Sequence, residues 1–290
     1  MNFKKLVKNW VGMVATTTVF LGAVFVAPPA YSAASNKPLA MYYLSLGDSY
    51  AAGGQAGPGP VGGFPVLVVA DAAPNQRLML RNFGCGEATT TSLLSVVGCS
   101  FPATTHAVSY PTTTQLAAAI SFIDAHPGRI GLITVTIGGN NFTDGVSTVA
   151  SIQADIVTIS AQLRAAAGAS IPILGLTYPN TTLTSWLSGP SGESAAQTSA
   201  TAFQRVRNPA LAAGYASSKV TFVNVTAATG GYTPLTQLIN YSTYGEIPYA
   251  VAQVCILTGV CSDNNDVQPT YAGSKLIAKL VLKAYLKLVF

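Results

Sequence analysis

This sequence of 290 residues contains five short runs of apolar and β-branched residues, which restrict the folds that it can adopt. Alanine-rich stretches with helical spacing lie between and after them. Strands that alternate with helices predict a parallel sheet with helices on both faces, a three-layer α/β/α sandwich. Neither an internal repeat nor a linker interrupts the pattern, so we expect one domain over residues 34–290. The predicted strands are 41–46, 77–82, 130–137, 171–177 and 220–225, and the predicted helices are 115–125, 146–167, 195–213 and 272–288.

The N-terminal segment has the pattern of a secretory signal peptide. Lys4, Lys5 and Lys8 form a basic region, and an apolar run follows over residues 10–26. Small residues of the kind that signal peptidase accepts come directly after it. The alternative is an uncleaved membrane anchor, but the run is at the lower limit of the length that spans a bilayer. We therefore expect residues 1–33 to be removed and the mature protein to be secreted.

The predicted mature chain is almost neutral. Only 9% of the residues are charged and 49% are hydrophobic, which excludes intrinsic disorder. Of the 15 basic residues, three are lysines of the signal peptide, so about 12 remain against 10 acidic ones. The sequence has no basic patch of the kind that nucleic-acid binding requires, and no phosphate loop, dinucleotide fingerprint or metal-ligand spacing. We expect no cofactor, no metal ion and no nucleic acid.

Four cysteines form two local pairs in the sequence, Cys85 with Cys99 and Cys255 with Cys261. Four cysteines allow three disulfide connectivities, of which local pairing is favoured. An oxidising compartment outside the cell would maintain both bridges. The alternative is a zinc site with four thiolates, but the sequence lacks the closely spaced cysteine pairs of zinc ribbons.

Two segments lie outside the predicted core. Residues 53–65 are rich in glycine and proline and predict a loop, whose length inside a compact domain suggests a function. The last predicted helix carries lysines four residues apart, which indicates a solvated face; contact with anionic lipid or a cell-wall polymer is the alternative. Nothing in the sequence requires more than a monomer. The lysines are Lys275, Lys279, Lys283 and Lys287.

Candidate catalytic residues follow three of the predicted strands at their carboxyl ends, the edge at which open α/β sheets bind ligands. Ser49 follows the first strand within Gly47-Asp48-Ser49, at the predicted start of a helix. Such a position suits a nucleophilic serine, although an Asp-Ser pair can also merely cap a helix. Gly86, after the second strand, offers a backbone N–H. Asn140, after the third, can donate its amide to an oxyanion or cap a helix.

Together these loops resemble those of the SGNH/GDSL hydrolases, secreted serine esterases with a flavodoxin-like fold and a parallel sheet of five strands. The resemblance covers nearly all of the mature chain, and the segments NFGCGEATTTS, TVTIGGNNF and VCILTGVC are similar to those of secreted bacterial members. It implies that Ser49 is the nucleophile and that the Gly86 N–H and the Asn140 side chain form an oxyanion hole. It also implies a bridge in each cysteine pair. The family usually has aspartate where this chain has Asn141.

The fourth family motif is altered. Family members carry an aspartate shortly before a His-Pro or similar pair, whereas this chain reads Asp266-Val267-Gln268-Pro269. Gln268 thus stands where the family has its catalytic histidine. Asp266 matches the aspartate of the shorter family spacing, and the longer spacing falls on Asn265. The histidine takes the serine proton and returns it to the leaving group. Glutamine has no basic nitrogen near neutral pH, so it can orient Ser49 but cannot deprotonate it.

Only two histidines are available to replace the missing base. His126 precedes the third predicted strand, so we expect it at the opposite edge of the sheet, as a cation at a helix C-terminus. His106 lies in the long connection after the second strand. We hypothesise that it substitutes as the base from a different loop.

Three functions are compatible with these observations. The first is a secreted hydrolase of carboxylic esters, the acyl or acetyl esters of a lipid or a carbohydrate, that forms an acyl-enzyme on Ser49. The second is a pseudoenzyme that binds an ester, glycan or lipid in the same cleft. The third is a surface protein that adheres through its lysine-bearing helix or its glycine-rich loop. The resemblance favours the first function, and Gln268 favours the second.

Overall fold

The computed structural model describes residues 40–59, 61–72 and 76–290, which lie within one compact unit of residues 37–290. The predicted signal peptide, residues 1–33, lies outside the described residues. Within the three described ranges, no helix has both the length and the apolar character needed to cross a membrane.

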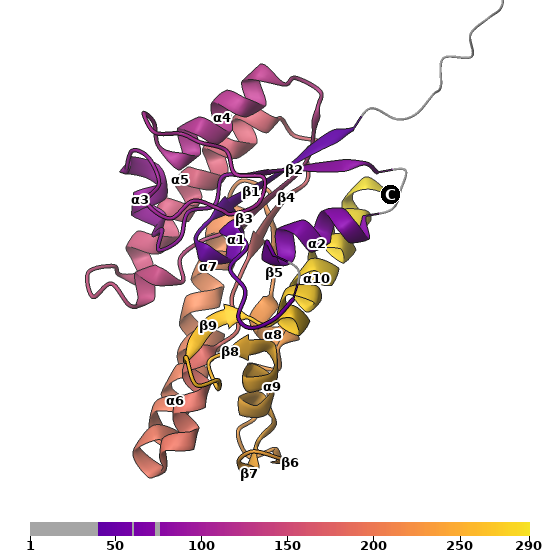
Figure 1. The fold of residues 1–290 in the computed structure, drawn as a ribbon. Helices are drawn as coiled ribbons and strands as arrows, with labels where there is room; N and C mark the ends of the chain where they lie inside the picture. Colours follow the sequence, from indigo (N-terminus) through magenta and orange to yellow (C-terminus); the bar gives the residue numbers. More distant parts are fainter. Residues whose placement is uncertain (1–39, 60, 73–75) are drawn as a thin grey trace, which may run out of the picture. The chain divides into compact units, whose positions relative to one another are not determined.

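A parallel sheet of five strands occupies the centre of this unit, in the order β2-β1-β3-β4-β5 (Figure 1). It confirms all five predicted strands. The middle strand β3 is buried along its whole length, as expected for a parallel strand covered on both faces. The strands are β1 (Met41–Gly47), β2 (Leu78–Asn82), β3 (Ile130–Thr136), β4 (Ile173–Leu176) and β5 (Thr221–Val223).

Helices cover both faces of the sheet, which confirms the three-layer α/β/α fold (Figure 1). Successive side chains of a strand point to opposite faces. Accordingly Leu44 belongs to the core beneath one helical layer, and its neighbour Tyr43 to the core beneath the other. The first layer holds α3 (Thr90–Ser95), α4 (Gln115–Ala125), α5 (Val149–Ala167) and α7 (Asn208–Ala216), and the second holds α2 (Gly63–Asp71) and α10 (Tyr271–Val289).

The predicted helices at 115–125, 146–167 and 272–288 correspond to α4, α5 and α10. All four lysines of α10 are exposed, while its apolar face packs on α2 and the sheet. The predicted helix at 195–213 is in fact two helices, α6 (Pro190–Ala202) and α7, which a π-helical turn, Phe203–Arg207, joins.

The predicted loop at 53–65 is too long, because α2 begins at Gly63. Pro65 lies in the first turn of α2, where a missing N–H breaks no intrahelical hydrogen bond. Phe64 and Val68 of this helix are buried against the core beneath α10. Tertiary packing of this kind stabilises a short helix that local propensity does not predict.

The sequence analysis did not predict several short elements near the carboxyl edge of the sheet or beyond it. Many of them pack around a small third core that includes Leu183, Ile247 and Val251. One of these short elements, β9, carries Gln268. The elements are η1 (Asn140–Phe142), η2 (Thr181–Ser188), α8 (Val225–Ala228), β6 (Leu238–Tyr241), β7 (Gly245–Pro248), α9 (Tyr249–Leu257), β8 (Thr258–Gly259) and β9 (Asp266–Pro269). The helix start predicted at Ser49 is present as the short helix α1 (Ser49–Ala52).

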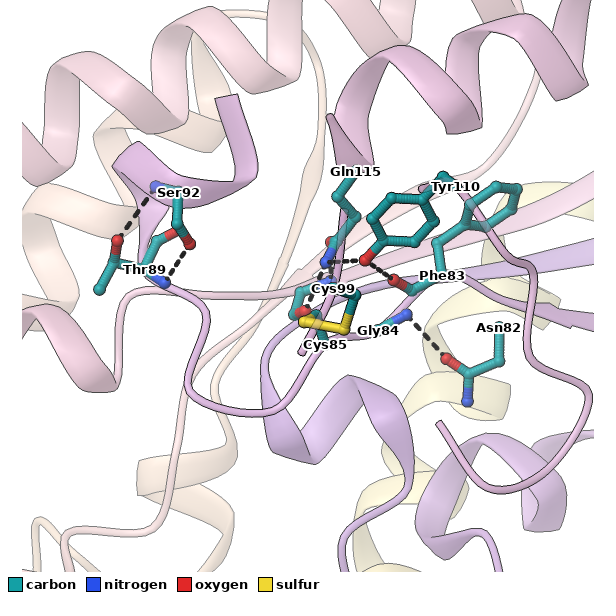
Figure 2. Close-up of a disulfide and its surroundings, with 10 residues drawn as sticks. Asn82, Phe83, Gly84, Cys85, Thr89, Ser92, Cys99, Tyr110 and Gln115 are labelled. Atoms are coloured by element: carbon teal, nitrogen blue, oxygen red, sulfur yellow. Dashed lines mark hydrogen bonds between the residues drawn. A yellow bond between two sulfur atoms is a disulfide. The ribbon is translucent and has the colours of Figure 1, made fainter. Parts of the chain in front are cut away.

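Both predicted disulfides are present, which rules out the zinc alternative. Cys85 bonds to Cys99 across the loop that follows β2 (Figure 2). Cys255, in α9, bonds to Cys261 just after β8. Each bridge therefore braces a loop close to the carboxyl edge of the sheet, where the candidate site lies.

Candidate active site

Ser49 is the first residue of α1, directly after β1. Asp48 caps this helix, because its Oδ1 accepts the N–H of Tyr50 at 3.0 Å. The N–H of Ser49 donates to no acceptor within the described ranges. It is therefore one of the orphan donors of a helix start and is available to a ligand.

Gln115, the first residue of α4, fixes the backbone that precedes Ser49. Its Oε1 accepts the N–H of Gly47 at 2.7 Å, and its Nε2 donates to the carbonyl of Gly47 at 3.0 Å. The same Nε2 donates to the hydroxyl of Tyr110, which donates to the carbonyl of Phe83 (Figure 2). This buried network ties the Ser49 turn to the loop that the Cys85–Cys99 disulfide closes.

Gln268 contacts the predicted nucleophile directly. Its Nε2 donates to Ser49 Oγ at 2.9 Å. Its Oε1 is buried and receives no hydrogen bond from the described residues. The strand that carries it is held to α1, since the hydroxyl of Tyr50 donates to the carbonyl of Val267 at 2.8 Å. The structure thus brings the side-chain amide of Gln268 within hydrogen-bond distance of the Ser49 hydroxyl.

Asp266 orients Gln268 through the backbone. Its Oδ1 accepts the N–H of Gln268 at 2.9 Å. An aspartate that serves a catalytic histidine bonds the ring nitrogen instead and sets the tautomer. In this chain the carboxylate shapes the strand end and leaves the side chain of Gln268 to bond Ser49.

Asn140 shares a cavity with Ser49. One N–H of its amide is committed, because Nδ2 donates to the carbonyl of Ala88 at 2.9 Å. An amide group has two N–H donors, so the second remains for an oxyanion.

Gly86 is placed differently from the expectation. Its only N–H donates to the carbonyl of Phe101 at 2.8 Å, so it is not free to bind an oxyanion in this conformation. The cause is the loop closed by the Cys85–Cys99 bridge, which brings Phe101 against Gly86. The donors near Ser49 are therefore its own N–H and the amide of Asn140.

Neither histidine lines the cavity that holds Ser49. The backbone carbonyl of His106 accepts the N–H of Asn82 beside the edge strand β2, and the residue is exposed. His126 ends α4 before β3 begins, and its Nδ1 bonds the carbonyl of Phe122 at 2.8 Å. The geometry favours neither as the missing base.

Asp48 and Tyr178 form a buried pair that the sequence analysis missed. The hydroxyl of Tyr178 donates to Asp48 Oδ2 at 2.5 Å, and the tyrosine packs edge-on against Tyr50. Burial raises the pKa of Asp48 to about 7, although the hydrogen bonds that it accepts, that from Tyr178 above all, act in the opposite direction. Tyr178 lies two residues beyond β4, so the rule that selected Ser49 and Asn140 could have found it.

This burial predicts how stability depends on pH. The ordinary pKa of Asp48 is 3.8, so folding takes up a proton between about pH 4 and pH 7. The group therefore adds stability as pH falls through 7. From pH 7.5 to pH 5.5, wild type should gain about 2 kcal/mol in unfolding free energy relative to Asp48→Asn, which cannot titrate. Urea denaturation of both proteins at the two pH values measures this; parallel changes would contradict the buried, titrating carboxyl.

The cavity beside Ser49 has a volume of about 270 Å³. The apolar side chains of Phe142, Phe203 and Leu211 are among those that line it. Arg207 also lines the cavity, and its guanidinium carbon lies 4.2 Å from the ring centre of Phe142. The volume is just below the usual range for small-molecule sites.

No protein-family model matches the sequence, and no curated protein matches it either. Solved structures do match. The lipase Lip_vut3 from a goat rumen metagenome has a TM-score of 0.52 at 14% identity, over 84% of this chain and 97% of that chain. Protein YxiM from Bacillus subtilis has a TM-score of 0.51 at 15% identity, over 86% of this chain and 56% of that chain.

An extracellular lipase from Streptomyces rimosus has a TM-score of 0.46 at 17% identity, over 84% of this chain and the whole of that chain. The likenesses to Lip_vut3 and to YxiM, both with TM-scores above 0.5, establish the fold. The chain has the α/β fold of these two proteins, one of which is a lipase, with a central parallel sheet of five strands.

Proposed function

We propose that this protein is a serine ester hydrolase in which Ser49 attacks a carboxylic ester. The observation that supports it best is that the Ser49 hydroxyl and the Asn140 amide line one cavity, while the N–H of Ser49 lacks an acceptor within the described residues. Two donors directed at a developing oxyanion are the largest single contribution to acyl transfer in many hydrolases. The substrate class is an acyl or acetyl ester of a lipid or a carbohydrate.

The reaction proceeds in two steps. Ser49 Oγ bonds to the carbonyl carbon, the bond from that carbon to the alcohol oxygen breaks, and the serine proton ends on the released alcohol. Water then attacks the acyl-enzyme, its oxygen enters the carboxylic acid, and a proton returns to Ser49 Oγ. Gln268 orients the hydroxyl but accepts no proton, so the proton travels through solvent. Turnover is slow because general base catalysis is missing.

A second function is supported by the same contact. Gln268 donates to Ser49 Oγ, and no histidine lines the cavity. A protein that binds an ester without turning it over needs only the cavity and the oxyanion donors. This pseudoenzyme is the alternative proposal.

We also propose that the protein is exported. The support is the N-terminal sequence together with two disulfides, which persist in oxidising compartments. A monomer with a solvated lysine face on α10 remains our expectation for its state.

The test is hydrolysis of p-nitrophenyl acetate by the mature protein. We expect wild type to be at least about tenfold faster than Ser49→Ala, because only wild type has the hydroxyl that forms an acyl-enzyme on this activated ester. Ser95→Ala, at an exposed serine outside the cavity, is the matched control and should equal wild type.

Labelling separates the two proposed functions. Diethyl p-nitrophenyl phosphate should add a diethylphosphoryl group to wild type and Ser95→Ala, and none to Ser49→Ala, as read by intact-mass spectrometry. Equal hydrolysis by wild type and Ser49→Ala, together with no label, would refute the hydrolase and leave the binding protein.

A further inference from the structure

Arg207 brings a positive charge into the cavity that contains Ser49. It is the last residue of the π-helical turn Phe203–Arg207 between α6 and α7. Such turns occur frequently at functional sites, because the extra residue in the turn redirects side chains. Its neighbour Arg205 lies on the same turn but is exposed and does not line the cavity.

Two aromatic rings hold the guanidinium group. Its central carbon lies 4.2 Å from the ring centre of Phe142 and 5.2 Å from that of Phe203. Stacking of this kind stabilises the cation and fixes its plane without using its N–H groups. The rings thus position a planar fork of donors at the cavity wall.

The donors of Arg207 have no partner within the described part of the chain, where the guanidinium makes neither a hydrogen bond nor an ion pair. Among the described residues, the one carboxyl group that lines the cavity belongs to Asp48, whose oxygens accept from Tyr50 and Tyr178. Partial burial lowers the pKa of Arg207 below its ordinary value, which reflects the cost of desolvating this cation. A desolvated cation without a partner is unfavourable, and an anion that enters the cavity relieves that cost.

We infer that the ester bound in this cavity carries an anionic group, a carboxylate or a phosphate, which the guanidinium of Arg207 binds through paired N–H donors. The inference rests on the proposed function, since Ser49 marks where the ester carbonyl lies. Arginine matches both oxyanions with two parallel hydrogen bonds. A neutral ester can contact the apolar side chains of the cavity but leaves the guanidinium of Arg207 unpaired. Arg207 is therefore a specificity-determining residue, because it distinguishes anionic from neutral esters.

Binding to the Ser49→Ala protein tests the inference without turnover. Isothermal titration calorimetry compares monoethyl succinate with ethyl 4-oxopentanoate, its neutral counterpart of the same length. A second pair, 1-butyrylglycerol 3-phosphate and 1-butyrylglycerol, tests phosphate. We expect at least one anion to bind about 10- to 100-fold more tightly than its neutral partner. The pair with the larger ratio identifies the anion.

Variants assign the effect to Arg207. On the Ser49→Ala background, Arg207→Gln should abolish the preference for the anion, whereas Arg205→Gln should preserve it. Arg207→Lys retains the charge but loses the fork, so part of the preference should remain. If Arg207→Gln fails to fold by circular dichroism, the lysine variant decides by its loss of affinity for the anion.

Equal binding of anionic and neutral esters, absence of binding by any of the four, or a preference that both Arg207 variants keep would overturn the inference. The proposed function fails separately, when wild type shows no Ser49-dependent hydrolysis of p-nitrophenyl acetate. That substrate carries no anionic group, so its hydrolysis does not depend on the inferred charge recognition.

Discussion

Replacement of Gln268 by histidine is expected to accelerate hydrolysis of p-nitrophenyl acetate about 100- to 10,000-fold, the usual contribution of general acid–base catalysis. The glutamine Nε2 already lies 2.9 Å from Ser49 Oγ, so an imidazole at this position is within reach of the proton. The measurement is kcat/KM for wild type and Gln268→His from pH 5 to pH 9. The activity gained should rise with pH around 6.5, as the imidazole loses its proton.

Two controls isolate the base. Gln268→Ala removes the contact with Ser49 without adding a base and should not accelerate the reaction. Ser49→Ala combined with Gln268→His should lose the gain, because an imidazole on its own has no serine to activate. A Gln268→His protein no faster than Gln268→Ala would show that the cleft lacks the geometry for acyl transfer. The gain should stop short of a complete triad, because Asp266 bonds the backbone of residue 268.

Gly47→Ala is expected to lower the unfolding free energy by at least about 3 kcal/mol. Gly47 ends β1 with a φ of +128°, a region that L-residues rarely adopt. A Cβ there would overlap the carbonyl oxygen of Thr136 in the neighbouring strand β3. Relief of this overlap requires β1 to separate from β3 or the Gln115 hydrogen bonds to break. Urea denaturation measures the loss, and p-nitrophenyl acetate hydrolysis should fall with it.

Gly57→Ala is the matched control, because Gly57 also has a positive φ, +72°, but a Cβ there meets open space. Gly57→Ala should lower the unfolding free energy by only about 1–2 kcal/mol, the cost of placing an L-residue in a left-handed conformation. Equal losses in the two variants would mean that the close approach of β1 to β3 contributes nothing.

Much of the fold could be predicted because its signals are local. A buried parallel strand such as 130–136 is a continuous run of apolar and β-branched residues, and α4 and α5 have helical spacing over several turns. The position of Ser49 and Asn140 at one edge follows from strand direction alone. Short elements such as α2 and β9 were not predicted. They have too few residues to show a hydrophobic periodicity, and they depend on tertiary packing.

The candidate site likewise has features that the sequence predicted and features that depend on the tertiary structure. Residue types in the sequence identified a serine, an asparagine and a glutamine in place of a histidine, because chemistry belongs to the side chain. Only the tertiary structure decided which atoms are free to react. The N–H of Gly86 donates to the carbonyl of Phe101, and Asp48 accepts a hydrogen bond from Tyr178. Arg207, from a turn far along the chain, lines the cavity. Hydrogen-bond competition and burial depend on neighbours that are distant in sequence, and these neighbours exist only in the folded chain.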